Sequence, residues 1–197
     1  SQNVTPKEAD SELLALFILK KQVRHQEVGV VKTIDIDVDF NGIIIFDYPG
    51  ILAPFGGKIE DGDNILQEFT TTDKGDLVLT EGIALPIMGL DDGGYVVRLF
   101  LNEFPDNKDR EVIFTDKYFY LNVTGDLYVD DMAVFWEWED YTGWINTDVP
   151  KGIYRVSLEG VHLLKGEETV YCYDLIFEKT NQLGIRDVEP RSGSRIY

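Results

Sequence analysis

Hydrophobic and polar side chains alternate along residues 28–40. A period of two is typical of a β-strand with one buried face and one solvent-exposed face. Asn41-Gly42 is a hairpin signal, so residues 43–48 are predicted to return as a second strand. In the first strand, the side chains expected in the core are Val28, Val30, Ile34, Ile36, Val38 and Phe40, and those expected in water are Thr33, Asp35, Asp37 and Asp39.

Short segments of strand character continue along the rest of the chain, at a spacing of roughly ten residues. Turns rich in Gly, Asp, Asn and Pro separate them, for example at residues 73–75, 91–94 and 124–126. This pattern favours an all-β fold, an antiparallel β-sandwich with one N-terminal helix, and a β-barrel is the second choice. The predicted strands are residues 65–71, 76–81, 94–103, 111–115, 117–123, 126–129, 132–138, 152–159 and 169–178.

Residues 7–26 carry the clearest helical pattern. Leu13, Leu16 and Phe17 recur at helical spacing, and acidic residues fill the first turns, where they favour a helix N-terminus. Such a helix would cover a face or an edge of a sheet. The expected organisation is a flexible N-terminus at 1–6, one β-sandwich domain at 7–183 with its helix at 7–26, and a flexible tail at 184–197.

The charge of the chain is strongly negative. Its 197 residues hold 36 acidic and 18 basic side chains, a net charge of −18. Such a field repels nucleic acid and anionic membranes and speeds encounter with a basic protein, although solubility alone is an equally good explanation. The tail is locally basic, with Arg186, Arg191 and Arg195, so it either stays free or lies on the acidic surface.

Cysteine usage bears on the compartment. Cys172 is the single cysteine, so no disulfide can form within the chain. This favours a reducing, cytoplasmic setting. The apolar run at residues 13–19 is too short to span a bilayer, and no signal peptide is recognisable. A leader removed upstream of Ser1 would instead place the protein outside the cytoplasm.

Acidic and large aromatic side chains are interleaved along residues 118–150. This stretch has no lysine or arginine and holds all three tryptophans. If 132–138 is a strand, Trp136 and Trp138 share one face and are expected in the core. Trp144 would lie in the following turn, where it could anchor a protein interface, stack on a sugar or cap the end of the sandwich. The candidate partner-binding residues are Asp130, Asp131, Glu137, Glu139, Asp140, Tyr141 and Trp144.

Residues 37–44, DVDFNGII, match the first eight positions of an EF-hand calcium loop. The match fails at the twelfth position, where Tyr48 replaces the bidentate glutamate, and strands rather than helices are predicted on both sides. A strand with solvent-exposed aspartates is therefore the better interpretation. A weak calcium site at Asp37, Asp39 and Asn41 is the alternative, and no other cofactor is expected.

No catalytic motif is recognisable. His25 and His162 lie in different segments, no His/Cys cluster could bind zinc, and Cys172 lies in an apolar strand, where a core position is expected. Glu137 and Glu139 would be about 7 Å apart on one strand face, but glycosidases draw their two acids from different strands of a cleft. The sequence therefore indicates a binding protein, not an enzyme.

Two resemblances refine this interpretation. In overall character the chain resembles the small acidic immunity proteins of bacterial toxin systems, and the turn-strand at residues 149–156, VPKGIYRV, is similar to the competence-associated nuclease-inhibitor family of β-sandwiches. The resemblance implies a cytoplasmic inhibitor whose partner is a basic toxin or nuclease. The alternatives are an extracytoplasmic carbohydrate- or calcium-binding module and a structural subunit whose tail docks on a neighbour. The oligomeric state is open.

Overall fold

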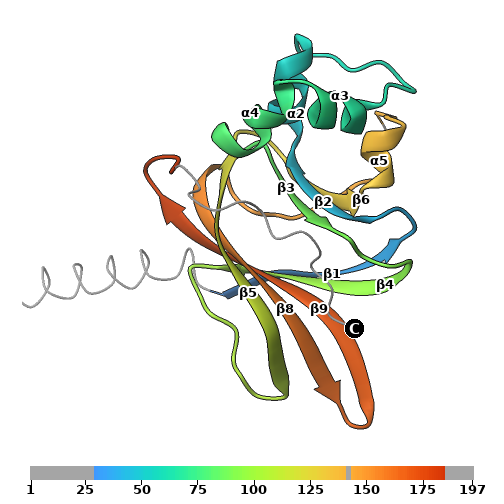
Figure 1. The fold of residues 1–197 in the computed structure, drawn as a ribbon. Helices are drawn as coiled ribbons and strands as arrows, with labels where there is room; N and C mark the ends of the chain where they lie inside the picture. Colours follow the sequence, from blue (N-terminus) through green and yellow to red (C-terminus); the bar gives the residue numbers. More distant parts are fainter. Residues whose placement is uncertain (1–28, 141–142, 185–197) are drawn as a thin grey trace, which may run out of the picture.

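The protein folds into two β-sheets that face each other, with a layer of short helices outside the smaller sheet (Figure 1). The computed structural model describes residues 29–140 and 143–184. The larger sheet has the strand order β1 (Gly29–Val38), β4 (Gly93–Leu101), β9 (Glu168–Thr180), β8 (Gly152–Lys165) and β5 (Arg110–Val123). The smaller sheet has the order β3 (Ala84–Met88), β2 (Gly42–Asp47), β6 (Leu127–Asp131) and β7 (Ile145–Asn146).

The predicted all-β sandwich is confirmed. Every strand pair is antiparallel except β4 and β9, which run parallel. The alternation predicted for the first strand is also confirmed, because Ile34, Ile36 and Val38 are buried between the sheets while Asp35 and Asp37 are exposed. The two sheets are separate, so the alternative of a closed barrel does not apply.

Strand β2 is buried on both faces and separates two hydrophobic cores. Ile43 and Ile45 point into the core between the sheets, whereas Ile44 and Phe46 point into a second core under the helices. Figure 1 shows these helices together over β2, β3 and β6. They are α2 (Tyr48–Leu52), the 3₁₀ turn η1 (Ala53–Phe55), α3 (Ile65–Thr71), α4 (Lys74–Thr80) and α5 (Ala133–Trp136).

Three predicted strands are wrong, since residues 65–71, 76–81 and 132–138 contain helices α3, α4 and α5. Their apolar side chains pack against the second core at spacings of one, three and four residues, which a helix satisfies better than a strand. At the start of α3, the Asn64 side chain accepts a hydrogen bond from the Gln67 amide at 2.8 Å, as a helix cap does. The predicted helix at 7–26, the segment 1–6 and residues 185–197 lie outside the described residues.

A network of paired charges lies on the face of the larger sheet that points away from the smaller one. Arg98 donates to the fully buried Asp174 carboxylate at 2.6 and 2.7 Å, and Arg110 donates to it at 2.8 Å. Arg110 also pairs with Glu159. The network links β4, β5, β8 and β9 with two positive and two negative groups, so each buried charge is compensated.

Asp174→Asn should lower the free energy of unfolding by about 3 to 5 kcal/mol, because Arg98 then loses its counter-charge and the buried Arg110 keeps only that of Glu159. Urea unfolding measures this. The matched control on the same strand is Glu178→Gln, whose partner Arg155 is 41% exposed, and it should cost less than about 1 kcal/mol. Equal losses for the two variants would show that the network does not stabilise the sheet.

Candidate functional site

The three tryptophans occupy different environments. Trp138 is fully buried and Trp144 is only 7% exposed, whereas Trp136 is 54% exposed. The expected burial of Trp136 is therefore wrong, because α5 turns its side chain away from the second core. Of the roles considered for Trp144, those that need an exposed ring do not fit, because its ring lies 5.0 Å from that of Trp138 and 5.2 Å from that of Phe46 and closes the second core.

The exposed Trp136 packs against Phe40, which lies in the turn between β1 and β2. The two ring centroids are 5.4 Å apart. This separation is within the range of favourable aromatic pairs. The pair joins two segments almost a hundred residues apart in the sequence and presents a large aromatic surface to solvent.

The buried carboxylate of Asp131 holds these two segments together. One of its oxygens accepts from the backbone amides of Asp39 and, at 3.1 Å, of Phe40. The other oxygen accepts from the Ala133 amide at 2.6 Å, at the start of α5. Asp131 is 9% exposed, so its carboxylate faces backbone amides and positions the aromatic pair. The prediction that Asp131 itself contacts a partner does not fit this geometry.

Two open hollows lie beside the aromatic pair. One, of about 640 Å³, is lined by Phe40 and by the exposed carboxylates of Asp39, Asp91 and Asp92. The other, of about 360 Å³, is lined by α5 and by the exposed Glu137 and Glu139. No lysine or arginine is among the described residues that line either hollow. We call this area the Trp136 surface, made of Asp39, Phe40, Asp91, Asp92, Trp136, Glu137 and Glu139.

The sequence singled out Glu137 and Glu139 as partner-binding residues and Asp39 as a solvent-exposed candidate calcium ligand, but it did not place Phe40, Asp91, Asp92 or Trp136 on this surface. Asp91 and Asp92 join it because β1 and β4 pair with Val38 opposite Gly93, which brings the turn before β4 beside the turn after β1. The sequence shows both turns but not their pairing. Phe40 was expected in the core, and it is half-buried beside Trp136.

The remaining candidates lie at the edge of the Trp136 surface or away from it. Asp130 is half-buried and accepts from the Asp131 amide at 2.7 Å. Asp140 is exposed and accepts from the Tyr48 hydroxyl at 2.8 Å. Burial, and next this hydrogen bond, raise the pKa of Tyr48 to about 12. Tyr141 lies outside the described residues.

In the part of the chain that the structure describes, the predicted calcium site is not joined by a cluster of metal-ligating side chains. Asp37 and Asp39 are exposed on β1 and its following turn, and Asn41 takes the left-handed conformation, φ 56°, that the turn requires. Within residues 29–140 and 143–184, no three His, Cys, Asp or Glu side chains come together as metal ligands would. The site at Asp37, Asp39 and Asn41 stays a prediction.

Other reactive groups lie elsewhere in the sandwich. The expected core position of Cys172 is confirmed, and burial raises the pKa of its thiol. His162 on β8 lies 3.6 Å from the Glu111 carboxylate. In the described part of the chain, no helix combines the length and the apolar character needed to cross a bilayer.

These features define an all-β sandwich with an outer helical layer and an acidic, aromatic surface. The fold is weakly similar to that of ComJ from Bacillus subtilis, an inhibitor of the DNA-degrading activity of NucA, with 11% identity and a TM-score of 0.46 over 78% of this chain and 98% of ComJ. Crocagin biosynthetic gene J matches at 15% identity and a TM-score of 0.44, over 73% of this chain and 94% of that one. No family model and no curated protein sequence matches. The resemblance to nuclease-inhibitor sandwiches is thus a weak similarity of fold.

Asp131→Asn should lower the free energy of unfolding by about 2 kcal/mol, because the amide group that replaces one oxygen cannot accept from the backbone donors. Chemical denaturation measures this, with the exposed Glu139→Gln as control at about 0.5 kcal/mol or less. If the two variants are equally stable, Asp131 does not hold the turn and α5 together.

Acrylamide should quench the fluorescence of the native protein mainly through Trp136, since the other two tryptophans are buried. Trp136→Phe should remove most of this quenching, whereas Trp144→Phe should leave it nearly unchanged. Greater protection in the Trp144→Phe variant than in the Trp136→Phe variant would contradict the assignment of the exposed ring.

Proposed function

We propose that the protein is an acidic protein-binding domain that inhibits a basic partner, such as a toxin or nuclease, in the manner of an immunity protein. The observation that carries the proposal is the exposed Trp136–Phe40 pair between carboxylates, in an area whose described lining has no lysine or arginine. The role is non-catalytic, and the setting proposed is the bacterial cytoplasm.

The Trp136 surface has the physical properties of a contact for a basic protein. A tryptophan at the centre of an interface contributes a large apolar area, and surrounding groups that exclude water strengthen it. The flanking carboxylates of Asp39, Glu137 and Glu139 can form charge-assisted hydrogen bonds with arginine and lysine. The net charge of −18 adds long-range attraction that speeds association.

The same chemistry explains how binding would inhibit. An enzyme that acts on nucleic acid attracts phosphates with a positively charged active site. Carboxylates of the Trp136 surface would occupy the place of those phosphates, and the aromatic pair would slow dissociation. Asp130 and Asp140 lie at the periphery in this proposal, and Asp131 contributes by positioning the turn and α5.

The burial of Trp144 argues against the carbohydrate-binding alternative, which used this tryptophan as its sugar contact. Trp144 is closed into the second core, so its ring offers no face on which a sugar could stack. Calcium binding at Asp37, Asp39 and Asn41 remains a separate prediction that titration calorimetry with Ca²⁺ can decide.

Affinity capture from the native organism's lysate at low salt, with elution by rising salt, tests the binding proposal. A basic protein should elute stoichiometrically. Trp136→Ala should weaken the complex about thirtyfold, as expected for an interface hot spot. Glu137→Lys with Glu139→Lys should slow association, because like charges then face the partner.

The matched control is Glu111→Lys with Glu168→Lys, two exposed acids on β5 and β9 that give the same change in net charge. If this control weakens binding as much as the Glu137 and Glu139 pair, only net charge matters and the Trp136 surface is not the contact. Inhibition is tested separately, by titrating the captured protein's activity. The captured protein should lose its activity in proportion to the amount of inhibitor added, up to one molecule for one. Full activity of the captured protein in the complex would reject the inhibitory role.

A further inference from the structure

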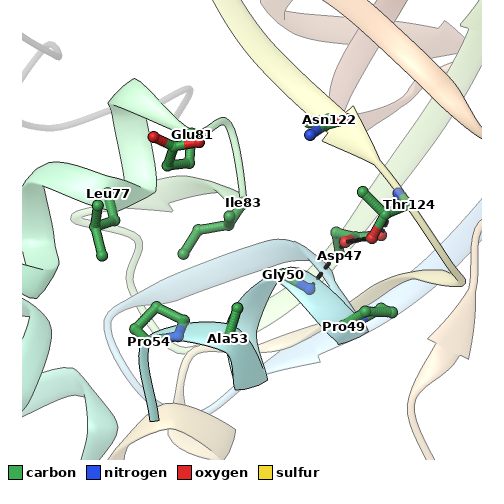
Figure 2. A pocket seen from close by; sticks show the side chains of 10 residues that line it. All are labelled: Asp47, Pro49, Gly50, Ala53, Pro54, Leu77, Glu81, Ile83, Asn122 and Thr124. Atoms are coloured by element: carbon green, nitrogen blue, oxygen red, sulfur yellow. Dashed lines mark hydrogen bonds between the residues drawn. The ribbon is translucent and has the colours of Figure 1, made fainter. Parts of the chain in front are cut away.

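A third hollow lies at the other end of β2 from the Trp136 surface. It has a volume of about 440 Å³ and opens between α2 and η1, the end of α4, and the last part of β5 (Figure 2). The side chains of Pro54, Leu77 and Ile83 give it apolar walls. A hollow of this kind, mostly apolar with a few polar groups, is the usual form of a binding pocket.

The buried carboxylate of Asp47 forms the inner end of this pocket. It accepts from the amides of Gly50, Thr124 and Gly125 at 2.9, 2.9 and 3.0 Å, and from the Thr124 hydroxyl at 2.6 Å. Four donors saturate a carboxylate, so Asp47 fixes α2 to the turn after β5. None of these donors carries a positive charge, so the negative charge of Asp47 is not compensated locally.

Two further polar groups lie at the pocket. Glu81 follows α4 and is exposed, and Asn122 is half-buried on β5 (Figure 2). Within the described residues, neither side chain makes a hydrogen bond or an ion pair. No lysine or arginine is among the described lining residues. The pocket therefore combines two carboxylates, one carboxamide and apolar walls, with no cation among the residues described around it.

We propose that this pocket binds the guanidinium group of an arginine side chain supplied by a basic protein partner. The planar fork of a guanidinium fits a carboxylate in a bidentate manner, so Glu81 is its acceptor, and the Asn122 carbonyl accepts a further N–H. The apolar walls pack against the aliphatic stem, and the charge of Asp47 adds attraction. The claim that a partner protein supplies the arginine rests on the proposed function. The claim that the pocket binds a guanidinium group does not.

The probe for this pocket is N-acetyl-L-arginine amide, titrated into the full-length protein and followed by ¹H–¹⁵N NMR. Binding should be saturable in the millimolar range, as expected for so small a ligand. It should shift the Asn122 side-chain signals and the backbone signals of Glu81 and Gly50. The citrulline analogue, which has the same shape without the charge, should bind at least tenfold more weakly.

Glu81→Gln should weaken binding of the probe about tenfold, whereas Glu168→Gln, at an exposed acid on β9 outside both proposed sites, should leave it unchanged. Equal binding of the arginine and citrulline compounds, or equal loss in both variants, would overturn the assignment. These results do not depend on the captured partner. The pocket can therefore bind the arginine probe even if the proposed function is wrong, and the proposed function can be right even if the pocket does not bind the probe.

A last variant tests the source of the arginine. Replacing Arg186, Arg191 and Arg195 with Gln should leave the affinity for the probe unchanged if a partner supplies the side chain. An affinity at least fivefold higher in this variant would show that the chain's own arginines compete for the pocket, and would overturn the partner as the source.

Discussion

The proposed contact surface depends on the carboxylate of Asp131. Its oxygens accept from amides of the turn that carries Phe40 and from the first residue of α5, the helix that carries Trp136. Without this link, the rings of Phe40 and Trp136 would be held together less firmly, because they lie on two short segments from distant parts of the chain. Preorganisation of this kind reduces the entropy lost on binding, because the contact groups are already ordered.

Three buried aspartates stabilise different parts of the molecule by the same means. Asp131 binds amides at one end of β2, Asp47 binds amides and a hydroxyl at the other end, and Asp174 binds two arginines on the larger sheet. Each of the three carboxylates accepts several hydrogen bonds, as a buried charged group must. These acids contribute to the net charge of −18, but their oxygens are occupied by hydrogen bonds within the chain, so direct contacts of the Trp136 surface are left to exposed acids such as Glu137 and Glu139.

Local pattern was enough to predict the sandwich but not the helical layer. Residues 29–38 alternate cleanly because one face of β1 is buried, whereas residues 65–71 and 76–81 are so short that strand and helix patterns cannot be distinguished. The site was harder still to predict. Trp136, expected in the core, is exposed because α5 replaced a strand, and Asp91 joined the surface only through the pairing of β1 with β4.

Hydrogen–deuterium exchange on the protein, alone and bound to the captured basic partner, tests the central claim most directly. The account predicts slower exchange on binding in residues 39–41 and 133–140, with the far ends of β8 and β9 unaffected. Protection confined to β5, β8 and β9, with the turn after β1 and α5 exchanging as in the free protein, would contradict the assignment of the Trp136 surface as the contact.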